Sequence, residues 1–188
     1  TGLLWTVMSD RANNTLYEDA ERDFEIDNKM DIGQKAWVTD YDGNMLHLVN
    51  YDDPTIALGW ISAKKLILNQ FSYISDKRQV LYKAMILLSM DEITNIEDDI
   101  TQGDKKKLYP LPDNNSKTMN EANKFDFYYV LKEADDWILL SKNEVLDGSS
   151  QDAKNRIMGW IKKREITEWN HNVCMEPNNK REVVAAYK

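Results

Sequence analysis

The sequence contains one cysteine, Cys174, and two histidines, His47 and His171, among its 188 residues. A single cysteine excludes an internal disulfide, and so few sulfur and imidazole groups leave few ligands of the kind that zinc sites use. His171 and Cys174 lie three positions apart, but two ligands do not close a metal site. We therefore expect the chain to hold neither a metal nor a cofactor.

Long apolar runs are also missing, and none approaches the ~20 residues that a membrane helix needs. Positive charge is in deficit: 24 Lys and Arg stand against 32 Asp and Glu, which gives a net charge of -8 and a pI near 4.9. A chain with this charge lacks the usual electrostatic attraction to nucleic acid. We expect no nucleic-acid partner and no membrane insertion.

The motifs of the common enzyme classes are absent too. There is no Gly-rich phosphate loop and no nucleophile elbow. Three carboxylate pairs are each adjacent in sequence, so their members would point to opposite faces of a strand: Asp52-Asp53, Asp98-Asp99 and Asp135-Asp136. The segment Asp40 to Asn44 starts like a calcium loop, but its glycine falls at the wrong position, and a plain turn is the better interpretation. We expect the chain not to be an enzyme.

What the sequence does contain is an internal repeat. Two Gly-Trp-Ile triplets, Gly59-Trp60-Ile61 and Gly159-Trp160-Ile161, lie 100 positions apart, and basic residues follow each. Upstream, three further matches share an offset of 92: Leu16-Tyr17 with Leu108-Tyr109, Ala36-Trp37-Val38 with Tyr128-Tyr129-Val130, and Met45 to Leu48 with Trp137 to Leu140. Nearer the start, Thr6 to Ser9 matches Ile86 to Ser89 at an offset of 80. The second copy thus carries extra residues between its apolar runs, where surface loops tolerate insertions.

The apolar runs within each copy are short, rich in aromatic and branched residues and bounded by turn residues, which predicts strands. Asp40 to Asn44 predicts a hairpin turn in which Gly43 supplies a positive φ. The spacing of Ile93, Ile96 and Ile100 permits a short helical turn between Ser89 and Lys107. We predict an all-β chain with units at residues 1–76 and 77–170, joined near Asp76 to Gln79, and a tail at 171–188.

Five short strands that end in Gly-Trp-Ile and a basic, apolar strand resemble the bacterial SH3-like (SH3b) domain family. The resemblance rests on Gly59-Trp60-Ile61 and Gly159-Trp160-Ile161, and it implies two tandem SH3-like small β-barrels with a partly extended C-terminal tail. Many members of this family bind peptidoglycan. Their Asn-hydrophobic-Arg-Ser-Gly signature in the first loop has only a faint counterpart here, Asp10-Arg11-Ala12-Asn13.

The tandem copies and the segment Trp169 to Pro177 also resemble the SH3-like region of the TssR accessory proteins of the Bacteroidetes type VI secretion system. This implies a non-catalytic interaction or scaffolding module of a larger exported protein. Its partners would be proteins of the cell envelope or a secretion complex, and its location the periplasm or envelope. The alternative is the peptidoglycan-targeting region of a cell-wall hydrolase whose catalytic domain lies outside this fragment.

Aromatic side chains are the candidate binding residues. Trp60 and Trp160 offer flat apolar faces for a ligand, but closure of a core is the better interpretation, with Gly59 and Gly159 allowing a bend or bulge. Ile61 and Ile161 are expected to point into their barrels. Aromatic residues of the first loop and middle hairpin could line a groove for an extended peptide, or could simply pack. These candidates are Tyr17, Trp37, Tyr41, Tyr109, Tyr128 and Tyr129.

Overall fold

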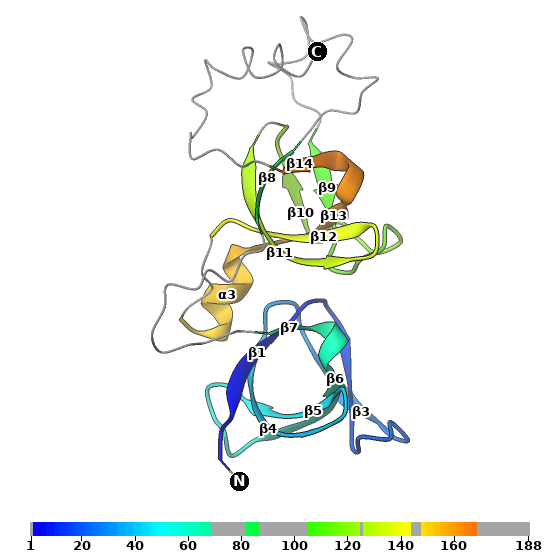
Figure 1. The fold of residues 1–188 in the computed structure, drawn as a ribbon, viewed down its shortest axis with the longest axis vertical. Helices are drawn as coiled ribbons and strands as arrows, with labels where there is room; N and C mark the ends of the chain where they lie inside the picture. The colour runs from blue at the N-terminus through cyan, green and yellow to red at the C-terminus, as the bar shows by residue number, and fades with distance from the viewer. Residues whose placement is uncertain (1, 69–81, 87–104, 125, 144–147, 169–188) are drawn as a thin grey trace, which may run out of the picture.

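The computed structural model describes residues 2–68, 82–86, 105–124, 126–143 and 148–168, and most of them lie in antiparallel strands (Figure 1). The prediction of a mainly β chain is confirmed. The described part of the chain has one α-helix, the seven-residue α3, Ser150–Arg156. The helical turn that the spacing permits between Ser89 and Lys107 falls largely outside the described residues, and its last residues belong to a strand.

The first sheet has seven strands in the order β3-β2-β6-β5-β4-β1-β7. We call its residues, 2–68, the N-terminal unit. A 3-10 turn, η1 (Ala63–Lys65), leads into β7, which pairs with β1. The strands are β1 (Trp5–Ser9), β2 (Asn14–Tyr17), β3 (Glu25–Met30), β4 (Lys35–Asp42), β5 (Met45–Asn50), β6 (Ala57–Ser62) and β7 (Leu66–Leu68).

The second sheet has five strands in the order β13-β12-β11-β8-β14, with a two-stranded ladder of β9 and β10 beside it. Its described residues between 82 and 168 form the C-terminal unit. A second 3-10 turn, η2 (Lys163–Glu165), leads into β14, which pairs with β8. The strands are β8 (Tyr82–Ile86), β9 (Lys106–Leu108), β10 (Asn120–Ala122), β11 (Phe127–Ala134), β12 (Trp137–Ser141), β13 (Ile157–Lys162) and β14 (Ile166–Glu168).

The two units lie one above the other, with α3 beside their junction (Figure 1). Both sheets curl around an apolar core, but neither strand ladder closes on itself within the described residues. The predicted unit boundaries at 76 and 170 and the tail at 171–188 lie outside the described part of the chain.

The register of the strands repeats between the units. Val38 pairs with Leu48, and Leu48 with Gly59; at offsets of 92 and 100, Val130 pairs with Leu140, and Leu140 with Gly159. The bridge between Tyr17 and Trp60 recurs between Tyr109 and Trp160. The same internal ladder is therefore built twice.

The expected match of the first strands was wrong by three residues. Val7 pairs with Ala36, and Ala84 pairs with Tyr128, so the true offset of the first strand is 77 and not 80. Ile86 is consequently the counterpart of Ser9, and residues 87–89 lie outside the described part. A short apolar run carries little register information of its own, because register is set by the strands on either side.

Gly59 and Gly159 lie where another strand crosses closely. Both have a φ of 120°, and a Cβ on Gly59 would lie 2.7 Å from the Tyr17 carbonyl oxygen, as one on Gly159 would lie 2.8 Å from that of Tyr109. The ladder shifts register immediately beyond each glycine's partner, which is the bulge that the sequence predicts there.

The core consists of three apolar clusters. One lies within the N-terminal unit and contains Ile61, and a second lies within the C-terminal unit and contains Ile161. Both isoleucines are at most 1% exposed, as expected for side chains that point into their units. The third cluster joins the two units and includes Met8 from one and Trp160 from the other.

Replacing either bulge glycine should be costly. Gly59→Ala and Gly159→Ala should each lower the free energy of unfolding by ~1 to 3 kcal/mol through backbone strain. At both positions the steric clash between the new Cβ and a carbonyl oxygen should lower it further. Gly43→Ala is the matched control, because Gly43 also has a positive φ, 55°, but open space around it. Urea unfolding measures all three, and equal losses at the three positions would contradict this explanation.

The two core isoleucines should act independently. Ile61→Ala and Ile161→Ala should each destabilise the protein by ~2 to 5 kcal/mol through lost burial and the cavity left behind. Because the two side chains belong to different clusters, the double variant should lose the sum of the single effects to within ~0.5 kcal/mol. A larger deviation in denaturant unfolding would mean that the two cores act as one.

Candidate functional site

The outer face of the second sheet carries a row of four side chains on neighbouring strands. Tyr109 pairs with Trp160, Trp160 with Leu139, and Leu139 with Lys132. Residues directly opposite each other in an antiparallel pair point to the same face of the sheet. The inner face of the same strands holds Ile161 and its cluster. We call Tyr109, Trp160, Leu139 and Lys132 the C-terminal row.

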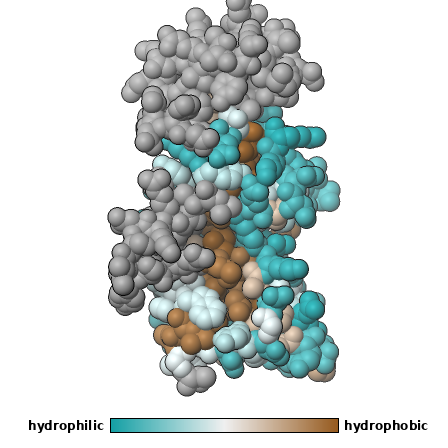
Figure 2. Space-filling model, viewed as in Figure 1, coloured by the Kyte–Doolittle hydropathy of each residue, from teal (hydrophilic) through white to brown (hydrophobic). Residues whose placement is uncertain are grey.

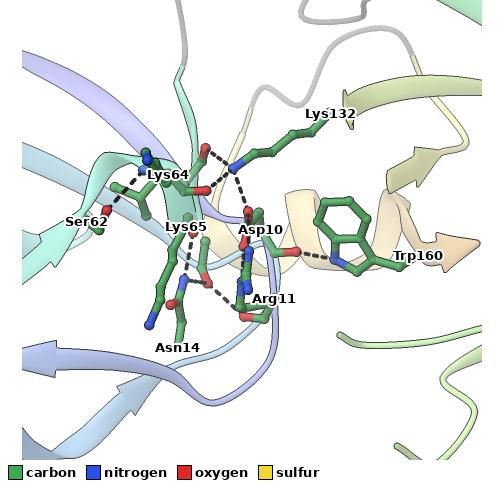
Figure 3. A network of polar contacts seen from close by, with 10 residues as sticks. Asp10, Arg11, Asn14, Ser62, Lys64, Lys65, Lys132 and Trp160 are labelled. Atoms are coloured by element: carbon green, nitrogen blue, oxygen red, sulfur yellow. Dashed lines mark hydrogen bonds and ion pairs between the residues drawn. The ribbon is translucent and has the colours of Figure 1, made fainter. Parts of the chain in front are cut away.

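This row holds Asp10 of the N-terminal unit (Figure 3). The Trp160 indole Nε1 donates a hydrogen bond to the Asp10 carbonyl oxygen at 2.6 Å, and the Lys132 ammonium lies 2.5 Å from the Asp10 carboxylate. Lys132 also donates to the carbonyl oxygens of Lys64 and Leu66, at 2.6 and 2.9 Å. One lysine and one tryptophan thus recognise both the side chain and the backbone of Asp10.

Asp10 is fully buried, and its charge is compensated. The Arg11 guanidinium lies against the same carboxylate, with Nε 2.6 Å from Oδ1, so two cations share one anion. Burial lowers the pKa of the Lys132 ammonium and the Asp10 carboxylate opposes that change. A buried carboxylate costs free energy unless it is paired and hydrogen-bonded, and here it is both.

The turn that presents Asp10 is held by hydrogen bonds within the N-terminal unit. The Asn14 amide donates to the Lys65 carbonyl oxygen at 2.7 Å and to the Ser9 hydroxyl at 3.0 Å (Figure 3). The Ser9 hydroxyl in turn donates to the Arg11 carbonyl oxygen at 2.8 Å. Asn13 takes the left-handed φ of 51° that asparagine tolerates better than most residues. These contacts hold the turn in the conformation that the C-terminal row binds.

Apolar packing surrounds this polar contact. Met8, Ile32 and Ile67 of the N-terminal unit pack with side chains of the C-terminal unit, and Trp160 is fully buried among them. The partners from the C-terminal unit are Leu131, Trp137, Leu139, Ala153, Ile157 and Trp160. We therefore expect the junction to be a permanent contact.

Helix α3 adds a second group of contacts to the junction. Its N-terminus is closed by a capping box between Ser149 and Asp152, and the Ser150 hydroxyl accepts a hydrogen bond from the Lys35 backbone N–H at 3.1 Å. The Lys35 ammonium donates to the Gly148 carbonyl oxygen at 2.7 Å, and Lys154 forms an ion pair with Asp31. The loop that enlarges the second copy thus serves to fasten the two units.

The N-terminal unit has a corresponding row on its own outer face. Glu25 pairs with Tyr17, Tyr17 with Trp60, Trp60 with His47, and His47 with Asp40. We call these five residues the N-terminal row. Tyr17, His47 and Trp60 are partly exposed, and Glu25 and Asp40 are exposed. At the repeat offsets, Tyr17, Trp60, His47 and Asp40 correspond to the four residues of the C-terminal row.

Polar contacts organise the centre of the N-terminal row. The Thr39 hydroxyl lies 2.8 Å from His47 Nδ1, and the His47 ring lies 5.2 Å from the Trp60 ring at an angle of 55°. Thr39 and His47 stand where the second copy has Leu131 and Leu139. The exposed row is therefore more polar than the buried one.

The six aromatic candidates from the sequence do not share one surface. Tyr17 belongs to the N-terminal row, whereas Tyr109 belongs to the buried row and makes an edge contact with Trp137 at 5.9 Å. Tyr128 lies in the core of the C-terminal unit, where burial and the Asp126 carboxylate raise its pKa to about 12. Tyr129 is partly buried on the same strand, with the Lys83 ammonium 5.9 Å from its ring.

The remaining two candidates lie on β4. Trp37 stacks on Tyr51 at 5.5 Å, and Tyr41 is 62% exposed with its ring 6.3 Å from that of Trp5. A role for any of the six in binding an outside partner stays a prediction. The pairing of Asp10 with Lys132 was missed, because a single acidic residue and a single basic residue 122 positions apart give no sequence signal.

A separate apolar area lies on the N-terminal unit near β1 and β7 (Figure 2). Leu3, Leu4 and Leu68 are about half exposed there, at 46%, 48% and 52%. In the sheet order, β5 and β4 lie between β6, which carries Trp60, and β1. None of the three leucines belongs to the N-terminal row.

Metal ligands do not gather in the part of the chain that the structure describes, where no three His, Cys, Asp or Glu side chains could hold an ion together. His171, Cys174 and the pair Asp98-Asp99 lie outside that part. Within it, no helix is long and apolar enough to cross a membrane.

Comparison of the chain with protein-family models, with curated proteins and with solved structures gives no match. The resemblances to SH3-like proteins thus rest on the residues themselves.

Loss of the cation at the junction should be costly. Lys132→Met leaves the buried Asp10 carboxylate with only one cation and should lower the free energy of unfolding by ~3 to 5 kcal/mol. Lys163→Met is the matched control, because Lys163 is 53% exposed and its pair with Glu133 should contribute less than ~1 kcal/mol. Guanidinium unfolding of both variants measures the difference, and similar small losses would mean that the Asp10 contact is dispensable.

Proposed function

We propose that the chain is a non-catalytic protein-interaction and scaffolding module built from two tandem SH3-like small barrels. The SH3-like assignment is supported by the repeated element order, in which a strand with Gly-Trp-Ile, a 3-10 turn and a short closing strand follow one another. In both units that closing strand pairs with the first strand. The same arrangement in two copies supports one domain type used twice.

One observation carries the interaction role: the outer face of one unit already binds a turn of the other unit of the same chain. The C-terminal row holds Asp10 through its carbonyl oxygen and its carboxylate. The N-terminal row presents the corresponding Tyr17 and Trp60, with His47 in place of leucine and Asp40 in place of lysine, and these side chains remain accessible. A scaffold that joins its own units through this face is well suited to join other proteins through the corresponding face.

The setting that best fits this role is a larger exported or envelope protein, such as an accessory component of a secretion system. A net charge of -8 disfavours anionic nucleic acid and acidic membrane surfaces as partners at moderate salt. Peptidoglycan carries both amines and carboxylates, so charge does not disfavour it. The cell-wall targeting region of a hydrolase is therefore the alternative that the test must separate.

The test compares two kinds of binding. The purified chain should bind a protein captured from the native envelope fraction with defined stoichiometry when that protein is purified and titrated by calorimetry. The chain should stay in the supernatant when it is sedimented with purified cell-wall sacculi, with the urea-unfolded chain as a control for adhesion. Recovery with sacculi, together with no stoichiometric protein partner, would reject the scaffold role and favour cell-wall targeting.

A further inference from the structure

The two rows differ most at their last position, where the charge is reversed. Lys132 in the C-terminal row corresponds to Asp40 in the N-terminal row, because each pairs with the equivalent residue of the next strand, Leu139 or His47. The tryptophan beside that residue, Trp160 or Trp60, is the same in both. The two rows thus share the indole N–H donor of a tryptophan, and they differ in the sign of the charge at the last position.

The C-terminal row shows how such a surface binds one residue. The Trp160 indole Nε1 donates a hydrogen bond to the backbone carbonyl oxygen of Asp10, and the Lys132 ammonium pairs with the carboxylate of the same residue. Recognition therefore requires a carbonyl oxygen and a charge opposite to that of the row, offered by one residue at a turn.

The corresponding two groups, an indole N–H and a charged side chain, are accessible in the N-terminal row. Within the described part of the chain, no hydrogen-bond acceptor lies against Trp60 Nε1, and the contact recorded for the ring is with His47. Asp40 is exposed, and its Oδ1 accepts a hydrogen bond from the Tyr41 backbone N–H at 2.8 Å. The second carboxylate oxygen of Asp40 faces no cation among the described residues.

We propose that the N-terminal row binds a turn or an extended segment of a partner protein through one lysine or arginine residue. The carbonyl oxygen of that residue accepts from Trp60 Nε1, and its cationic side chain pairs with Asp40. Tyr17 and His47 provide flat surfaces for the flanking backbone. This inference rests on the proposed function and identifies the surface and the chemistry of the partner.

The charge around the row fits a basic partner. Residues 2–68 contain twelve Asp and Glu and six Lys and Arg, and residues 18–27, which comprise the link from β2 to β3 and the start of β3, contain six acidic residues and one arginine. At the other end of the row, Glu25 is exposed and offers a second carboxylate, shared with Lys29 at 3.8 Å. Such a field attracts a basic segment and disfavours an acidic one.

The polar character of the row fits a reversible contact. Thr39 and His47 replace the leucines that are buried at the internal junction. Interfaces that form and dissociate are generally more polar than permanent ones.

Two peptides that copy the internal contact test the proposal. One is acetylated and amidated Met-Ser-Asp-Ala-Ala, the sequence of residues 8–12 with alanine in place of Arg11 so that it carries no cation, and the other has lysine in place of the aspartate. Titrations are followed by the NMR signal of the Trp60 indole N–H, assigned with Trp60→Phe. The lysine peptide should shift this signal and bind about tenfold more tightly than the aspartate peptide, as expected for one charge pair of ~1.4 kcal/mol.

Substitutions in the row should change this preference in a defined way. Asp40→Lys should reverse it in favour of the aspartate peptide, and Trp60→Phe should weaken both peptides. Asp52→Lys makes the same change in net charge on an exposed loop outside the row and should leave the preference in place. Equal binding of the two peptides by the wild-type chain, or an unchanged preference in Asp40→Lys, would overturn the proposal.

The same variants separate this proposal from the proposed function. If Asp40→Lys and Trp60→Phe both bind the purified envelope partner as the wild-type chain does, the surface is wrong and the scaffold role stands. If the peptides discriminate as expected but no envelope partner binds, the surface stands and the scaffold role is wrong.

Discussion

The arrangement of the two units depends on the burial of one carboxylate. Asp10 is fully buried between the units, where Lys132 and Arg11 share its charge and Trp160 binds its carbonyl oxygen. We infer that this buried charge contributes more to the specificity of the geometry than to stability, because its desolvation offsets most of the ion-pair attraction. The apolar cluster around Met8 stabilises the junction by burial, but hydrophobic contacts do not by themselves specify an orientation. Together they fix which face of the second sheet meets the first, and they leave the corresponding face of the first sheet accessible.

The repeat has diverged by changing side chains on its outer faces and keeping its inner ladder. The bulge glycines and the isoleucines after them serve the same purpose in both copies, since both are set by close strand crossing and core packing. On the outer faces of the sheets, Leu139 has its counterpart in His47, and Lys132 has its counterpart in Asp40. Divergence of this kind preserves folding and changes recognition. One face has thereby become an internal joint, while the corresponding face of the other copy stays accessible.

Much of the fold was predictable because it follows local rules. Short aromatic and branched runs between turn residues predicted strands, and the Gly-Trp-Ile triplets located the two copies. The register of the first strand was not predictable, since an apolar run does not specify which residue meets Ala36 or Tyr128. The junction was not predictable either. Asp10 looks like a loop residue and Lys132 like a solvated one, and only the paired sheets bring them together.

The claim that Trp160 and Asp10 form a permanent joint is tested most directly by hydrogen exchange of the tryptophan indoles. The Trp160 Nε1 proton should exchange only when the whole protein unfolds, with a protection free energy within ~1 kcal/mol of that of the slowest backbone amides in β5 and β12. Trp60, partly exposed and lacking an acceptor among the described residues, should exchange rapidly in the same sample and serves as the internal control. Rapid exchange of Trp160, at a rate similar to that of Trp60, would contradict the account.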